Sequence, residues 1–186
     1  RGQDVMQRRR DIVQLEHTGI VDPESNYSYG EGGAGAFSDG KLYTRSKKRG
    51  SVEKTLRIFC RFGADPKILV DAHPHIGTDK LPIIIRRMRE QIIASGGEVH
   101  FGCRMDELIL ERGRVRGAVS ADGRSFEGPV VLATGHSARD VYRYLHAADI
   151  FVEAKPTAVG VRPEHSPQPI DQFPYHNPEG RGKLMP

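Results

Sequence analysis

The sequence predicts an α/β fold, and three consecutive patterns carry this prediction. Apolar residues recur at helical spacing across residues 78–95 until Gly96-Gly97, and an alternating run at 98–103 follows directly as a strand. Three short β-type runs between residues 107 and 127, separated by turn residues, indicate an antiparallel meander. The apolar run at 129–133 then fits a strand buried on both faces of a parallel sheet. The order indicates part of an α/β sheet whose crossover is a small meander.

The first third of the chain is more polar. Residues 1–17 carry a few apolar positions among many charges, which is typical of a surface helix with a narrow apolar stripe. The densest glycine cluster follows at residues 29–42 and fits neither a regular helix nor a strand. Residues 51–62 return to helical spacing, and Ser51 is a suitable N-cap. We therefore expect a helix, a glycine loop and a second helix in this order.

Boundary signals complete the predicted elements. Thr78 or Asp79 is expected to cap the helix at 78–95, with Pro82 in its first turn. After the apolar run, Ser137 is expected to cap a helix that continues to about Ala147. The run Thr157–Val161 predicts one further strand.

Composition narrows the functional classes. The 186 residues include no apolar run long enough for a transmembrane helix, so no membrane insertion is expected. Two cysteines, Cys60 and Cys103, are too few for a disulfide scaffold, which favours a reducing, cytoplasmic setting in which both thiols are packed or free. The 28 basic and 24 acidic residues are interleaved, and the net charge of +4 favours an anionic small molecule as much as nucleic acid.

The glycine cluster is the first candidate for chemistry. Gly32, Gly33 and Gly35 permit backbone conformations that bring N–H groups close to a phosphate or a flat ring, and Lys41 adds a positive charge. It does not end in the G-K-[ST] of a Walker A loop, nor does it follow a strand as a dinucleotide fingerprint would. From residues alone, a ligand loop and a tightly turned surface loop remain equally good interpretations.

The end of the apolar run is the second candidate. A buried strand that enters Thr134-Gly135 and then a helix places small residues and free N–H groups at the sheet edge where α/β proteins bind ligands. His136 lies at this edge, and the alternative is a turn histidine bonded to backbone. Arg139 and Asp140 fit either a site or a solvated helical pair.

The sequence gives weaker evidence for a metal site, a redox site or a hydrolytic site. His73 and His75 flank Pro74, which favours a loop over a metal site, and no third ligand is near. The chain has no C-x-x-C redox motif, and Ser137 lacks the G-x-S-x-G setting of a hydrolase nucleophile. We therefore predict no metal site and no hydrolytic triad.

Three strings in this order resemble one family, the uncharacterised bacterial FAD-dependent dehydrogenases, which are glutathione-reductase-like flavoproteins with two dinucleotide-binding folds. They are YGEGGAGAFSDGKLYTR (29–45), HPHIGTDKLPIIIRRMREQIIASGGEVHF (73–101) and VVLATGHSARDVYRYL (130–145). The resemblance implies an internal segment of a longer protein: a partial Rossmann-like FAD-binding domain at 1–150, without its N-terminal βαβ unit and G-x-G-x-x-G motif, and the start of a substrate domain at 151–186.

The resemblance also assigns cofactor-binding residues. The glycine loop would lie along the pyrophosphate of FAD, the strand end beside the adenine, and the Ala-Thr-Gly turn where the buried strand returns to the cofactor. These positions are Gly32, Gly33, Ala34, Gly35, Ser38, Asp39, Lys41, Cys103, Arg104, Met105, Thr134, Gly135 and His136.

The function implied is that of an oxidoreductase which transfers hydride through a flavin to or from a small-molecule substrate, with NAD(P)H or another electron donor. The isolated segment is expected to be inactive. No catalytic acid or base is assigned; His136 and His75 are the nearest titratable groups, and Arg162 and His165 would face the substrate. The alternatives are a binding module that uses the basic stretch 41–61 for a polyanion or nucleic acid, and a purely structural domain.

Overall fold

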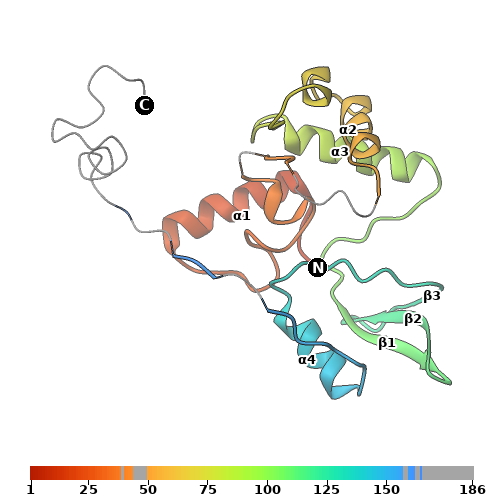
Figure 1. The fold of residues 1–186 in the computed structure, drawn as a ribbon. Coiled ribbons are helices and arrows are strands. Elements are labelled where there is room, and N and C mark those ends of the chain that lie inside the picture. Colours follow the sequence, from red (N-terminus) through yellow and green to blue (C-terminus); the bar gives the residue numbers. More distant parts are fainter. Residues whose placement is uncertain (39, 44–49, 157–158, 162–163, 165–186) are drawn as a thin grey trace. The chain divides into compact units, whose positions relative to one another are not determined.

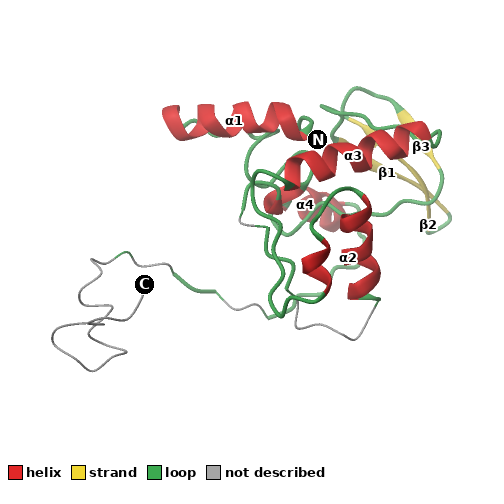
Figure 2. Ribbon diagram, turned by 90° about the horizontal axis from the view of Figure 1, so that it is seen from above, coloured by secondary structure: helices red, strands yellow, loops and turns green. Residues whose placement is uncertain are grey.

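A computed structural model describes residues 1–38, 40–43, 50–156, 159–161 and 164, and the chain divides into two units, Arg1–Phe151 and Val152–Pro186. Within its described residues the first unit combines four α-helices with one small antiparallel sheet (Figures 1 and 2). The predicted mixture of helices and strands is therefore confirmed. That the second unit begins a substrate domain stays a prediction.

Helix α1 (Val5–Thr18) confirms the helix predicted at the start of the chain. Asp4 caps it by accepting hydrogen bonds from the backbone N–H groups of the next residues, and Gly19 ends it in the left-handed conformation. Val5, Arg8 and Ile12 form its buried stripe, at helical spacing. The narrow apolar stripe thus contains one buried cation.

The main apolar core lies between α2 (Val52–Arg61), the 3-10 turn η2 (Pro66–Leu69) and α3 (Leu81–Ala94), which are neighbours in Figure 1. Its buried members are Leu56, Ala64, Ile68 and Ile84. Ser51 caps α2 by accepting a hydrogen bond from the Lys54 N–H at 3.1 Å, as predicted.

The predicted cap of α3 is wrong. Lys80 occupies the N-cap position, and no side-chain hydrogen bond caps the helix. Thr78 and Asp79 precede it in a turn. Pro82 in the first turn favours the helical backbone angle and lacks an N–H that needs a partner, so this helix starts without a polar cap.

The predicted meander is confirmed as β1 (Met105–Glu111), β2 (Arg114–Ser120) and β3 (Ser125–Glu127), paired antiparallel in the order β1-β2-β3. Arg112 and Gly113 join the first two strands with φ values of 51° and 74°, the left-handed pair expected of a two-residue hairpin turn. Their twist matches that of the strands they connect.

The two strands predicted on either side of the meander are wrong for this structure. Residues 98–103 and 129–133 have no strand assignment, and Val131 keeps 89% of its surface exposed. A strand needs a neighbour for its backbone groups, and the described residues place none beside either run. The apolar residues of both runs indicated that the runs would be buried, but the described residues of this chain do not bury them.

Helix α4 (Arg139–Ala147) follows the second apolar run, but Ser137 does not cap it; Ala138 is the N-cap residue. Residues 159–161 form no strand, and the rest of the run predicted at Thr157–Val161 lies outside the described residues. Among the helices that the structure describes, none has the length and apolar character needed to cross a membrane.

Candidate functional site

The glycine loop is held between two helices. It contains a short 3-10 turn, Gly33–Gly35, preceded by Gly32 with a φ of 81°. A Cβ on Gly30 would lie 2.2 Å from the Arg8 Cδ of α1, and one on Gly32 would lie 2.6 Å from the Ile85 Cδ1 of α3. Both contacts are far below normal van der Waals separation, so only glycine permits this close approach.

Arg8 fixes one side of this loop. Its side chain is fully buried, and its guanidinium donates to four backbone carbonyls, those of Glu31, Gly33 (3.0 Å), Asn26 (2.9 Å) and Tyr27 (3.2 Å). Among the described residues no carboxylate forms an ion pair with it. Burial lowers the pKa of Arg8, yet an arginine starts so far above neutrality that it remains protonated.

The far end of the loop is held by a short pairing with the His-Pro-His segment. Lys41 and His75 form an antiparallel bridge, and the backbone N–H of Ile76 donates to the Gly40 carbonyl at 3.1 Å. The Leu42 N–H donates to the Pro74 carbonyl at 2.8 Å. This segment therefore has a structural role, and the described residues hold no cluster of three metal-ligating side chains.

A cavity of about 500 Å³, which we call the loop cavity, lies between the glycine loop and α3. The loop contributes Gly32, Gly35, Ser38 and Lys41, and α3 contributes mainly apolar side chains, among them Ile85. An ion pair of 3.2 Å between Arg89 and Glu31 borders it. The loop cavity is thus an apolar space with backbone polar groups on one wall.

A second cavity of about 250 Å³, the arginine cavity, lies where β1 begins. Cys103, Arg104 and Met105 line it together with Thr134. Arg1 also lines it, bonded to Asp140 at 2.5 Å and stacked 4.4 Å over the Tyr29 ring. This cavity combines charged groups, an aromatic ring and small residues.

Charges beside the arginine cavity form one network. Arg1 and Arg104 both bind Glu24, at 3.0 and 2.8 Å, and Arg104 also binds Asp106 at 2.6 Å. The hydrogen bond from Arg104 holds the pKa of Asp106 below its usual range. Because these side chains are partly exposed, solvent screens the network and its contribution to stability is small.

We expect Arg104→Gln to raise the pKa of Asp106 towards its ordinary value, since the carboxylate loses its charged donor. A depressed acid stabilises the fold above its unfolded pKa, and this stabilisation is lost as the pH falls through the folded pKa. The variant should therefore lose less stability on acidification. Carboxyl NMR titration measures the shift, Arg116→Gln is the matched control, and an unchanged pKa of Asp106 would contradict this assignment.

His136 lies apart from both cavities, on a third cavity of about 550 Å³. Its Nδ1 lies 2.9 Å from the Ser137 Oγ, and its side chain is exposed. Gly33, Ala34 and Gly135 line none of these three cavities, and Asp39 lies outside the described residues. The residues expected to bind one cofactor are therefore divided among several places.

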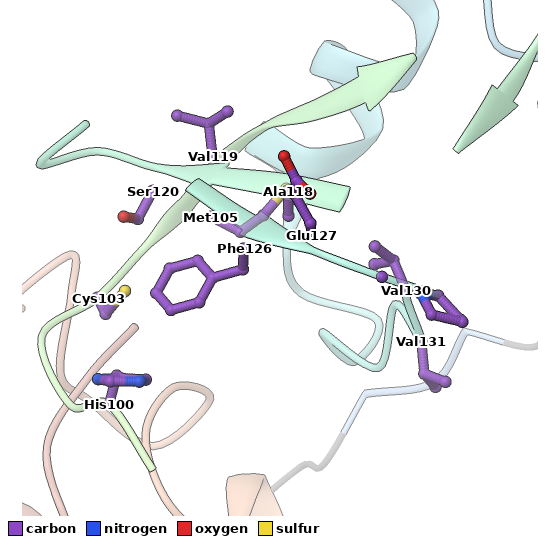
Figure 3. Close-up of a pocket in the computed structure, with 12 residues that line it drawn as sticks. His100, Cys103, Met105, Ala118, Val119, Ser120, Phe126, Glu127, Val130 and Val131 are labelled. Carbon is purple, nitrogen blue, oxygen red and sulfur yellow. The ribbon is translucent and has the colours of Figure 1, made fainter. Parts of the chain in front are cut away.

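A groove of about 410 Å³ separates the two runs that were expected to be strands. Figure 3 shows His100 and Cys103 on one side of it and Val130 and Val131 on the other, with Phe126 between them. The rings of His100 and Phe126 lie 5.2 Å apart. The groove is therefore bordered by both runs and by residues of the three-stranded sheet.

The basic stretch 41–61 lies partly outside the described residues, and Arg57 within it binds Glu53 at 2.7 Å. Arg162 and His165 lie outside them entirely. Polyanion binding and a substrate-facing role for these two residues stay predictions.

Sequence reasoning missed Arg8 and Tyr29. Arg8 lies three residues after Val5 and four before Ile12, so a charge on an apolar stripe was the signal. The Tyr29 hydroxyl donates to the Ser137 carbonyl at 2.7 Å, a contact across more than a hundred residues that no local pattern indicates.

The fold and these cavities define a mixed α/β protein with a glycine loop braced by a buried arginine. No family model matches the chain. It is 37% identical over 185 residues to an uncharacterized protein of Clostridium beijerinckii, a match that covers 99% of this chain and 34% of the relative. The chain thus spans about a third of the length of the curated relative it matches.

Proposed function

We propose that this chain is a segment of an FAD-dependent oxidoreductase. The observation that carries the proposal is the lining of the arginine cavity, which joins three distant parts of the sequence. Tyr29 begins the glycine string, Cys103 lies two residues after the second string, and Thr134 lies within the third string. A site assembled from the first string, the third string and the residues directly after the second is what the resemblance implies.

The residues present fit parts of the cofactor. Gly32 and Ala34 have backbone N–H groups without a hydrogen-bond partner among the described residues, which suits a pyrophosphate. The backbone at Cys103 and Met105, beside the Tyr29 ring, suits the adenine end. When bound, FAD would supply the hydride transfer itself, and the protein would bind and orient the reactants. The substrate would be a small molecule, with NAD(P)H or another electron donor as partner.

The proposal includes a Rossmann-like sheet completed by strands from outside this chain. The amides of Val131 to Thr134 have no acceptor among the described residues, and those of Val99 to Phe101 have none either. Apolar segments whose backbone groups are unpaired among the described residues offer an edge at which further strands can pair. The relative that matches is about three times as long as its matching part, which provides the chain length for such strands.

Hydrogen exchange tests this sheet. We expect the amides of residues 130–134 to exchange about 100-fold or more slowly in the complete natural polypeptide than in the 186-residue chain. The amides of the β1–β2 hairpin, already paired here, serve as the internal control. Fast exchange at 130–134 in both proteins would contradict strand addition.

The cofactor is tested on the complete polypeptide by its visible absorption spectrum. We expect a flavin spectrum after purification, or after incubation with FAD followed by removal of the unbound cofactor. A colourless protein that takes up no FAD would overturn the proposed function. A flavin spectrum without slower exchange at residues 130–134 would support FAD binding and contradict the proposed completion of the sheet.

A further inference from the structure

We propose that Arg8 is a positioning residue that turns the N–H groups of Gly32 and Ala34 outward as a binding site for a phosphate-bearing anion. This inference rests on the proposed function, because FAD carries such a group. It adds a residue on α1, which the resemblance did not assign to the site, and gives it a defined action on the loop.

The geometry of the peptide bond relates the carbonyls that Arg8 binds to the N–H groups that follow them. In a trans peptide the carbonyl of one residue and the N–H of the next point in opposite directions. Arg8 draws the carbonyls of Glu31 and Gly33 towards its guanidinium. The N–H groups that follow, those of Gly32 and Ala34, must therefore point away from Arg8.

These two N–H groups also have no partner among the described residues. The neighbouring amides of Glu31 and Gly33 donate to the carbonyls of Gln3 and Gly30, at 3.0 and 3.1 Å. No described residue accepts from Gly32 or Ala34, and both residues are exposed. Unused backbone N–H groups in a turn conformation are the donors that anion-binding backbone nests use.

The charge of Arg8 favours the same ligand. Its guanidinium is fully buried and, among the described residues, hydrogen-bonded only to neutral carbonyls; the carboxylates of Asp11 and Glu31 act on it through space without pairing with it. A buried cation in a low-dielectric setting is weakly screened and favours a negative charge on the other side of the loop. The guanidinium also fixes the orientation of the carbonyls that bind it.

A purely structural clamp is the competing explanation. A clamp would stabilise the loop without regard to what binds there, whereas an oriented anion site discriminates ligands with and without phosphate. The test therefore compares FAD with riboflavin, which has the same ring system and no phosphate. It uses the complete natural polypeptide and its Arg8→Met and Arg8→Lys variants.

Arg9→Met is the matched control, because Arg9 is the next residue of α1 and is exposed. We expect both Arg8 variants to lose at least about tenfold in FAD affinity, equivalent to about 1.4 kcal/mol. Lysine keeps the charge but cannot hold four carbonyls with a planar fork, so it should not rescue binding. Riboflavin affinity should change less than about threefold.

Equal losses for FAD and riboflavin, or wild-type FAD affinity in Arg8→Met, would overturn the inference. If the unsubstituted protein binds neither ligand, the proposed function fails. Hydrogen exchange at residues 30–36 then tests whether Arg8 positions the loop for an anion other than FAD. Inorganic pyrophosphate that slows exchange there in the unsubstituted protein and in Arg9→Met, but not in Arg8→Met, would support loop positioning for another anion. Unchanged exchange would reject it.

Discussion

Gly30→Ala should destabilise the chain by about 2–4 kcal/mol, through strain and displacement of Arg8 together. Gly30 has a φ of 104°, a conformation that side chains with a Cβ rarely adopt. The new methyl group would lie 2.2 Å from the Arg8 Cδ and 2.7 Å from its Nε. Arg8 would have to leave its carbonyls, and a buried cation without partners is expensive.

Two glycines of the same loop separate these contributions. Gly33 has a φ of 62° and no neighbour within 4 Å of a built Cβ, so Gly33→Ala should cost only the backbone term, about 1 kcal/mol. Gly35 has neither positive φ nor a close neighbour, and Gly35→Ala should be nearly neutral. Urea unfolding followed by circular dichroism gives all three values, and a loss for Gly30→Ala no larger than that for Gly33→Ala would contradict the Arg8 contact.

Local patterns predicted the elements whose determinants are local. The Arg112-Gly113 turn fixes the hairpin by its own backbone angles, and the Ser51 hydroxyl caps the helix that follows it. Both depend on a few consecutive residues. The 98–103 and 129–133 runs depend on partners instead, and their β-type patterns could not indicate that no neighbouring strand is present among the described residues.

The sequence indicated the glycine loop of the candidate site but not its arrangement, and the binding roles of the predicted residues stay predictions. Glycines indicated the loop, but which of its N–H groups remain free depends on the carbonyls that Arg8 binds. The arginine cavity likewise depends on contacts such as that of Tyr29 with Ser137, which are distant in sequence. Long-range contacts of this kind are set by packing, and periodicity carries no information about them.

Ile84→Ala should lower the free energy of unfolding by about 2–5 kcal/mol, the usual range for a fully buried isoleucine. Ile84 is 1% exposed and belongs to the cluster that joins α3 to Leu56 of α2 and Ile68 of η2. Partly buried hydrophobic residues pack around this cluster, and the size of the loss within that range depends on how far they can close the cavity. Denaturant unfolding measures the loss.

Ile83→Ala is the control, because Ile83 occupies the preceding position of the same helix and is 39% exposed. It removes the same atoms with nearly the same change in helix propensity, so the difference between the two variants reports burial alone. The difference should exceed about 1.5 kcal/mol. Equal losses would mean that α3 does not present Ile84 to this core, and the loop cavity, whose other wall is α3, would then lack its support.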